Sequence, residues 1–324
     1  MNNSNTRVII VAERIQDHSA ANNDDRTLEY LNDTYFNGLI NGLEVAQFSW
    51  LHISHPKELM KRNDLTEHDV VLSLWSGRES RNRRALAPAI CETLAIPYVG
   101  MDAYTATVCQ DKVLAKHFCA MAGLPTPKHV IVPQYRMPAD FSPLRFPCVV
   151  KPAFEGGSMG ISDSCIVHNA KEALALSLEM RDVWKQPILV EEFVQGREVS
   201  ICLYGKDEEY TIGATEIVVK DDPDYFDTHL NGYDLKKAHN RPRSIQQCPI
   251  QDYQSYINNC RNLFKSLGKV DFMRIDGKLN DKGFTVLELT PDSHLGPTAS
   301  FARSLTTKHH SYSDMLCDLI ALAK

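Results

Sequence analysis

The chain has 324 residues, which is enough for two or three packed units with cores of their own. Its 41 Asp and Glu exceed its 35 Lys and Arg, so no bulk positive field attracts nucleic acid or anionic lipid, and we expect neither as a partner. No apolar run reaches the ~18 residues of a membrane span, and we expect no signal peptide. Nine scattered cysteines without a C-x-x-C pair favour reduced, buried thiols in a cytoplasmic protein.

The first hundred residues alternate between strand-like and helix-like stretches. Strands are expected at Arg7–Ala12, Val45–Ile53 and Asp69–Leu74, and helices at Asp25–Asn41 and Ala85–Leu94. This rhythm predicts a βαβ domain with a parallel sheet, which we place at residues 1–103.

The rest of the chain has the pattern of α+β units, and we expect a central unit over residues 104–194 and a last unit over residues 195–324. Expected helices are Asp111–Gly123, Ala170–Trp184, Asp252–Leu267 and Tyr312–Ala323, and expected strands are Phe146–Lys151, Pro187–Phe193, Glu198–Tyr204, Val270–Leu279 and Phe284–Thr290. The polar stretch Lys220–Arg243 is too long for an ordinary connection, so we interpret it as a lid.

A glycine-rich loop follows the strand that ends at Lys151. Gly156, Gly157 and Gly160 allow backbone N–H groups to close around an anion, and Lys151 adds a positive charge beside them. The lysine precedes the glycines, so the loop matches neither a Walker A motif nor a dinucleotide-binding fingerprint. Taken alone, this loop is consistent with two interpretations, a phosphate site and a plain turn.

The strand from Leu189 ends in acidic residues. An adenine needs an apolar slot along a strand, and a ribose needs a carboxylate that accepts from its hydroxyls. The segment Leu189–Glu198 has the residue types to supply both. The alternative is an ordinary strand–turn–strand with solvated glutamates.

Two acidic residues are expected to face each other across a hairpin. A three-residue loop, Asp281–Gly283, would place Asp276 opposite Glu288 and Arg274 opposite Thr290, with all four side chains on one face. Facing carboxylates repel each other unless a cation lies between them, and Mg²⁺ bound to nucleotide phosphates suits such a pair. A register slip of one residue would separate them.

Together these motifs resemble the ATP-grasp superfamily, and most closely its D-alanine–D-alanine ligases. The resemblance rests on Asp111-Lys112, the loop from Lys151 to Gly160, Glu191–Glu198, and the R-x-D and E-x-T segments of the hairpin, and it covers roughly residues 69–300. It implies an α/β fold in which an N-terminal parallel-sheet domain precedes two α+β subdomains that clamp ATP. It also implies ATP and Mg²⁺, or Mn²⁺, as cofactors and a homodimer.

The resemblance also implies roles for individual residues. Lys112 and Lys151 resemble the phosphate-binding lysines, and Gly156, Gly157 and Ser158 the loop over the phosphates, with Lys151 and Ser158 counted as catalytic. Glu191, Glu192, Phe193 and Val194 resemble the adenine hinge and Glu198 the ribose ligand. Asp276, Glu288 and Thr290 take the metal positions, while Arg274 resembles the arginine that steadies the acyl phosphate.

The chain departs from the ligase pattern on the substrate side. Thr290 stands where the ligases have a metal-binding asparagine, and Asp292 is an alternative ligand. The segment Thr290–Ser300 is one residue longer than its counterpart, and Val11–Asp17 replaces the G-G-x-S-x-E signature that holds the first D-alanine. These departures argue against D-Ala plus D-Ala as the substrates.

Three further residues are candidates for substrate binding. Arg78 follows a strand at the end of the sheet where α/β proteins bind ligands, and so is a candidate for a substrate carboxylate. His294 is a candidate acid/base or carboxylate contact, and Ser300 a second carboxylate contact.

We therefore expect an enzyme, an ATP-dependent carboxylate–amine ligase that forms an amide through an acyl phosphate and releases ADP and phosphate. Its substrates are expected to be an amino acid or small carboxylic acid and an amine. Two alternatives are a non-catalytic ATP-binding regulator with the same fold and an ATP-grasp kinase that releases a phosphorylated product.

Overall fold

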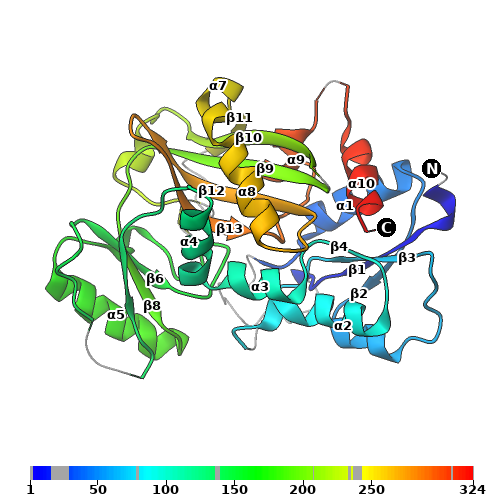
Figure 1. Ribbon diagram of the computed structural model, residues 1–324, viewed down its shortest axis with the longest axis horizontal. Coiled ribbons are helices and arrows are strands. Elements are labelled where there is room, and N and C mark those ends of the chain that lie inside the picture. Colours follow the sequence, from blue (N-terminus) through cyan, green and yellow to red (C-terminus); the bar gives the residue numbers. More distant parts are fainter. Residues whose placement is uncertain are drawn as a thin grey trace.

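The computed structural model describes residues 3–15, 29–77, 80–135, 139–206, 208–232, 235, 243–307 and 309–323. Three sheets form the framework, and each lies in its own part of the molecule (Figure 1). Within these described ranges, no helix is both long and apolar enough to cross a membrane. As the sequence predicted, the nine cysteines form no disulfide, and all but the half-buried Cys317 are buried.

The first sheet is parallel, as predicted, with strand order β2-β1-β3-β4. Its strands are β1 (Arg7–Val11), β2 (Ser49–Ile53), β3 (Asp69–Ser73) and β4 (Tyr98–Val99), and its main helices are α1 (Asp33–Val45) and α2 (Leu86–Leu94). The helix expected from Asp25 begins at Asp33 instead, because the side chain of Asn32 caps it by accepting from the N–H of Tyr35. Residues 16–28 lie outside the described ranges.

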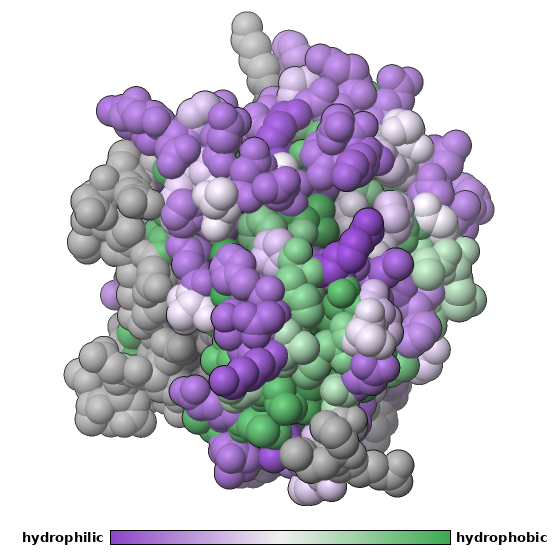
Figure 2. Space-filling view, turned by 90° about the vertical axis from the view of Figure 1, so that its left-hand side faces the viewer, coloured by the Kyte–Doolittle hydropathy of each residue, from purple (hydrophilic) through white to green (hydrophobic). Residues whose placement is uncertain are grey.

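The second sheet is antiparallel, with order β5-β8-β6-β7, and α5 packs against it. Its elements are β5 (His129–Val132), β6 (Cys148–Pro152), β7 (Ile166–Val167), α5 (Ala170–Trp184) and β8 (Ile188–Glu192). The sheet occupies the left-hand side of Figure 1. On that side hydrophilic residues frame a band of hydrophobic ones (Figure 2).

The third sheet is also antiparallel, with order β11-β10-β9-β12-β13. Its strands are β9 (Arg197–Lys206), β10 (Glu209–Val219), β11 (Arg243–Gln247), β12 (Phe272–Asn280) and β13 (Gly283–Thr290). The helix expected over Asp252–Leu267 is divided into α7 (Ile250–Tyr253), a 3-10 turn at Gln254–Tyr256 and α8 (Ile257–Ser266). The predicted α+β character of this part of the chain is confirmed.

Two short helices connect the first sheet to the second. They are α3 (Ala103–Gln110) and α4 (Lys112–Met121), where a single helix from Asp111 was expected. The carboxylate of Asp111 accepts from the N–H groups of Val113 and Leu114, at 3.0 and 3.3 Å, and so starts the second helix. Lys112 is therefore the first residue of α4, where the junction fixes its position.

The end of the chain returns to the first sheet. The last helix, α10 (Tyr312–Ala321), lies beside α1 (Figure 1), and its Met315 and Leu316 share one buried cluster with Leu39 and Leu43 of α1. The short helix α9 (Ser300–Leu305) contributes Phe301 to the same cluster. The boundaries at residues 103 and 194 stay predictions.

Replacing Leu316 with Ala tests this packing. Leu316 is 1% exposed, so its truncation leaves a cavity and is expected to lower the free energy of unfolding by about 2–5 kcal/mol. Leu94→Ala is the matched control, because Leu94 is 39% exposed and its truncation should cost less than about 1 kcal/mol. Urea unfolding followed by circular dichroism measures both. Equal effects of the two substitutions would contradict the packing of α10 on α1.

Candidate active site

One cavity of about 540 Å³ brings together most of the residues that the sequence singled out. The second and third sheets both contribute to its wall. The predicted residues that line it are Lys112, Lys151, Gly157, Ser158, Glu191, Glu192, Phe193, Val194, Glu198, Arg274, Asp276, Glu288, His294 and Ser300. Gly156 precedes two of them, and Thr290 donates a hydrogen bond to Asp276. Arg78 lies outside the described residues.

The predicted register of the hairpin β12–β13 is confirmed where it matters for the site. Arg274 pairs with Thr290, and Asp276 pairs with Glu288. The predicted loop of three residues is wrong, because Asn280 pairs with Gly283 and only two residues separate the strands. A bulge between Asp276 and Gly277 adds one residue on the opposite strand, so the register returns to the predicted pairing.

Each of the two facing carboxylates has cationic partners. Asp276 accepts from Arg274 Nε at 2.7 Å, from Ser200 Oγ at 2.6 Å and from Thr290 Oγ1 at 3.1 Å. Glu288 forms an ion pair with Lys112 at 3.2 Å. Burial acts to raise the pKa of Glu288, but Lys112 and Lys151 outweigh it and hold that pKa below its usual value. Glu288 is therefore ionised at neutral pH.

The donor set at the hairpin fits a divalent cation that phosphates help to hold. Within the described part of the chain, no three His, Cys, Asp or Glu side chains come together as a complete metal site. Two facing carboxylates and the Thr290 hydroxyl are hard oxygen ligands, which Mg²⁺ accepts when phosphate oxygens and water fill its other positions. Asp292, the alternative ligand, instead pairs with Arg84 at 2.9 Å.

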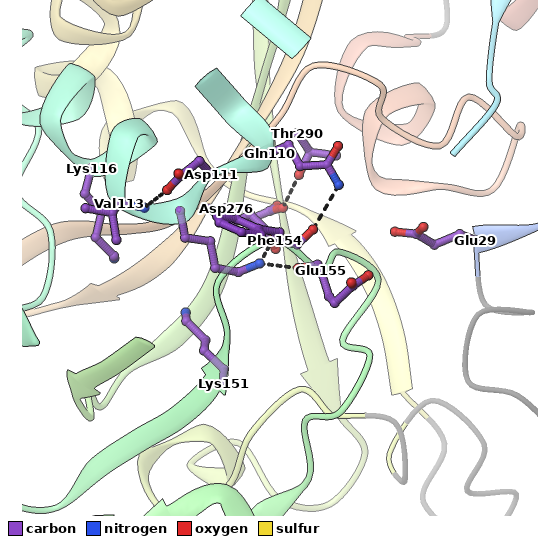
Figure 3. A network of polar contacts seen from close by, with 12 residues as sticks. Glu29, Gln110, Asp111, Val113, Lys116, Lys151, Phe154, Glu155, Asp276 and Thr290 are labelled. Atoms are coloured by element: carbon purple, nitrogen blue, oxygen red, sulfur yellow. Dashed lines mark hydrogen bonds and ion pairs between the residues drawn. The ribbon is translucent and has the colours of Figure 1, made fainter. Parts of the chain in front are cut away.

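Buried contacts hold the start of the glycine-rich loop. Glu155 accepts from Arg83 and from Gln186, both at 2.8 Å, and its carbonyl accepts from the ammonium of Lys112 (Figure 3). A Cβ at Gly156 would lie 2.7 Å from a Glu29 carboxylate oxygen and 2.8 Å from an Arg84 nitrogen, so a side chain there would displace this ion pair. These contacts fix the loop beside Lys112.

Part of the predicted lid contacts the glycine-rich loop directly. The hydroxyl of Ser158 donates to the carbonyl of Asn231 at 2.8 Å, and the N–H of Leu230 donates to Asp163 at 2.8 Å. Leu230 and Asn231 line the cavity, as does Arg243 at the start of β11. Residues 233–234 and 236–242 of the predicted lid lie outside the described ranges.

At the predicted adenine end, the side chains of the acidic residues bind cations. Glu191 lies between Lys151 and Lys116 and is 2.8 Å from Lys116. Burial acts to raise the pKa of Glu191, but the two lysines lower it to about 2. Glu198 forms an ion pair with Lys278 at 3.0 Å. Phe193 and Val194 supply the apolar part of the wall.

At the predicted substrate end, His294 and Ser300 line the cavity wall. His294 stacks on Tyr35 with 3.5 Å between the ring centroids, and its Nδ1 accepts from the N–H of Gly296 at 3.2 Å. In the neutral ring the proton is then on Nε2. Nearby, Arg84 pairs with Glu29 at 2.5 Å as well as with Asp292.

Five charged residues around the cavity have no role among the predictions from the sequence. They are Glu29, Arg83, Arg84, Lys116 and Lys278. The spacing of Lys116, four residues after Lys112, carried a usable signal, because positions i and i+4 lie on one face of a helix. For the other four, the partners are distant in sequence and no local pattern connects them.

Known proteins resemble this chain in sequence and in fold. A family model described as D-ala D-ala ligase C-terminus matches residues 118–321. A D-alanine–D-alanine ligase from Bacillus velezensis is 28% identical over 269 residues, which are 79% of this chain and 72% of that protein. The structure of D-alanine–D-alanine ligase from Bacillus anthracis complexed with ATP matches with a TM-score of 0.73 at 18% identity, covering 98% of this chain and 97% of that one. A D-Ala:D-Ser ligase structure from Enterococcus faecalis has a TM-score of 0.72 at 17% identity, covering 98% and 99%.

A parallel-sheet domain followed by two antiparallel α+β units around a cavity of cations and carboxylates defines an ATP-grasp protein, which confirms the predicted fold. The chain belongs to the D-alanine–D-alanine ligase family. It is an ATP-dependent carboxylate–amine ligase that forms C–N bonds, releases ADP and acts on small molecules.

The low pKa of Glu191 predicts how the stability depends on pH. Its folded pKa of about 2 lies below the usual 4.5, so its contribution to stability is complete above 4.5 and is lost as the pH falls towards 2. We expect the unfolding free energy of Glu191→Gln to fall less between about pH 5 and pH 3.5 than that of the wild type. Urea unfolding at several pH values measures the two slopes. Equal slopes would show that Glu191 is not held ionised by the lysines.

Proposed function

We propose that this enzyme joins the carboxylate of an amino acid or small carboxylic acid to an amine through an acyl phosphate, and that its substrate pair is not D-Ala plus D-Ala. The observation that carries the proposal is the convergence of Lys112, Lys151 and Arg274 with Asp276 and Glu288 on one cavity. Phosphoryl transfer needs mainly positioning and neutralisation of negative charge, which these groups supply.

We propose a position in the cavity for each part of ATP. We assign the adenine to Glu191, Glu192, Phe193 and Val194, the ribose to Glu198, and the phosphates to Lys112, Lys151 and the loop Gly156–Ser158. Asp276, Glu288 and Thr290 would hold Mg²⁺, or Mn²⁺ in its place, which would neutralise phosphate charge. These assignments rest on the lining of the cavity and on the family resemblance.

The chain's own residues support the remaining steps. Arg274 is held by Asp276 at 2.7 Å, and its guanidinium suits both the acyl phosphate and the charge of the tetrahedral intermediate. The contact between Ser158 and Asn231 favours a closed site, and water exclusion protects an acyl phosphate from hydrolysis. His294 and Ser300 present hydrogen-bonding groups for a substrate carboxylate.

The substrate part of the proposal is supported by the departures from the family pattern. The G-G-x-S-x-E signature is absent, and a half-buried ion-pair network of Glu29, Arg84 and Asp292 lies between the glycine-rich loop and the segment after β13. The D-Ala:D-Ser ligase among the structural neighbours has an acceptor other than D-alanine on the same fold. The regulator and the kinase are not favoured by any specific observation.

From the family resemblance we also propose a homodimer. A cytoplasmic location is supported by nine cysteines without a disulfide. Gel filtration with light scattering tests the first proposal, and cell fractionation tests the second.

The substrates can be identified by measuring ADP release from ATP and Mg²⁺ with pooled D- and L-amino acids and small carboxylic acids. A ligase gives ADP together with a product lighter than its two substrates by one water, which mass spectrometry detects. Efficient formation of D-alanyl-D-alanine would contradict the substrate proposal. ADP with a stable phosphorylated product would favour the kinase, and tight ATP binding without ADP from any pool would favour the regulator.

Glu288→Gln tests the metal site. This change removes one of two facing charges, so the Mg²⁺ concentration for half-maximal ADP release should rise at least about tenfold. Glu179→Gln is the matched control, because Glu179 is exposed on α5 and should leave the Mg²⁺ titration unchanged. A wild-type titration curve for Glu288→Gln would refute the assignment of Glu288 as a metal ligand.

A further inference from the structure

Helix α4 carries two buried lysines on the same face, at the side of the helix that contacts the cavity wall. Lys112 at its first residue pairs with Glu288, and Lys116 one turn later pairs with Glu191. Both are 4% exposed. The helix therefore joins the metal end of the site to the adenine end, although only Lys112 lines the cavity.

Three charged groups meet at Glu191. Lys116 extends from α4 and Lys151 from β6 (Figure 3), and both ammonium groups bind the same carboxylate on β8. Glu191 is 2% exposed and Lys151 is 6% exposed, so water screens these charges weakly. Two lysines on one carboxylate leave an excess of one positive charge beside the cavity.

Lys151 has two competing partners in the proposed function. Its ammonium binds Glu191 here, yet the proposed site requires it to bind the phosphates of ATP. If Glu191 had no other partner, the departure of Lys151 would leave a buried carboxylate unpaired, which is strongly unfavourable. Lys116 removes this cost because its ion pair with Glu191 remains.

Lys116 also weakens the ion pair between Glu191 and Lys151. The two ammonium groups repel each other, and this repulsion lowers the pKa of Lys116 in addition to the larger effect of burial. Negative phosphates arriving in the cavity relieve the repulsion when Lys151 moves towards them. The same arrangement keeps Glu191 ionised throughout.

We propose that Lys116 is a positioning residue that keeps Glu191 paired, so that Lys151 can transfer from Glu191 to the nucleotide phosphates. This inference rests on the proposed function, because it takes Lys151 as a phosphate ligand. Lys116 then affects the affinity for the nucleotide phosphates, although it does not contact the nucleotide itself.

The test is Lys116→Met, which keeps much of the side-chain volume and removes the charge. Lys151 then stays on Glu191, so the Kd for ADP should rise at least about tenfold. The Kd for adenosine, which has no phosphate, should change less than about twofold. In turnover assays the KM for ATP should rise more than kcat falls, because the lost step is the capture of phosphates. A lysine with a purely structural role would affect adenosine and ADP alike.

Three further variants control the interpretation. Lys265→Met removes another Lys–Glu pair, formed with Glu208 at the surface, and should leave both affinities unchanged. Lys116→Arg keeps the charge and should restore most of the ADP affinity. Lys116→Met combined with Glu191→Gln has no unpaired buried carboxylate, so it should bind ADP more tightly than Lys116→Met alone. This double variant also serves as the test if Lys116→Met fails to fold.

The outcomes separate this inference from the proposed function. If the wild type binds ATP and Lys151→Ala abolishes phosphate-dependent affinity, the assignment of Lys151 as a phosphate ligand holds. In that case, an ADP affinity of Lys116→Met equal to that of Lys265→Met overturns the inference about Lys116. Absence of any Lys151-dependent nucleotide binding in the wild type contradicts the proposed function itself. A double variant as weak as Lys116→Met also overturns the inference.

Discussion

The mutual neutralisation of buried charges is the constraint on which this site depends. The lysines and arginines around the cavity would repel one another unless carboxylates separated them. Glu155, Glu191 and Glu288 provide this separation, each bound to at least one cation. Asp276 does the same for Arg274. Arg274 and Asp276 are both on β12, but the other pairs join distant parts of the chain, which the arrangement of the three sheets brings together.

The fold and the main motifs were predictable because their signals are local. Alternating strand and helix patterns gave the parallel sheet, and period-two alternation gave the hairpin with Asp276 opposite Glu288. In the hairpin, the pairing of Asp276 with Glu288 was predicted correctly although the loop length was not. The loop is one residue shorter than expected, and a bulge restores the pairing before the carboxylates are reached. Neither the loop length nor the bulge had a unique signal in the sequence.

The ion pairs that complete the site could not be predicted, because they join residues far apart in the sequence. Arg84 pairs with Glu29, 55 residues before it, and with Asp292, 208 residues after it. No pattern within the sequence around Arg84 indicates either partner. The helical spacing of Lys116 from Lys112 could have predicted that both lie on one face of α4. Its partner Glu191 could not be predicted, because that contact depends on how α4 packs against the second sheet.

The same ion pairs compensate the lysines of the cavity within the protein itself. Glu191 and the carbonyl of Glu155 accept from Lys151 and Lys112, so neither ammonium is buried alone. A phosphate ligand then replaces protein acceptors instead of filling an uncompensated positive pocket. Such an exchange is feasible only if every acceptor that loses a lysine keeps another partner. Glu191 keeps Lys116 when Lys151 leaves, so this carboxylate meets the condition.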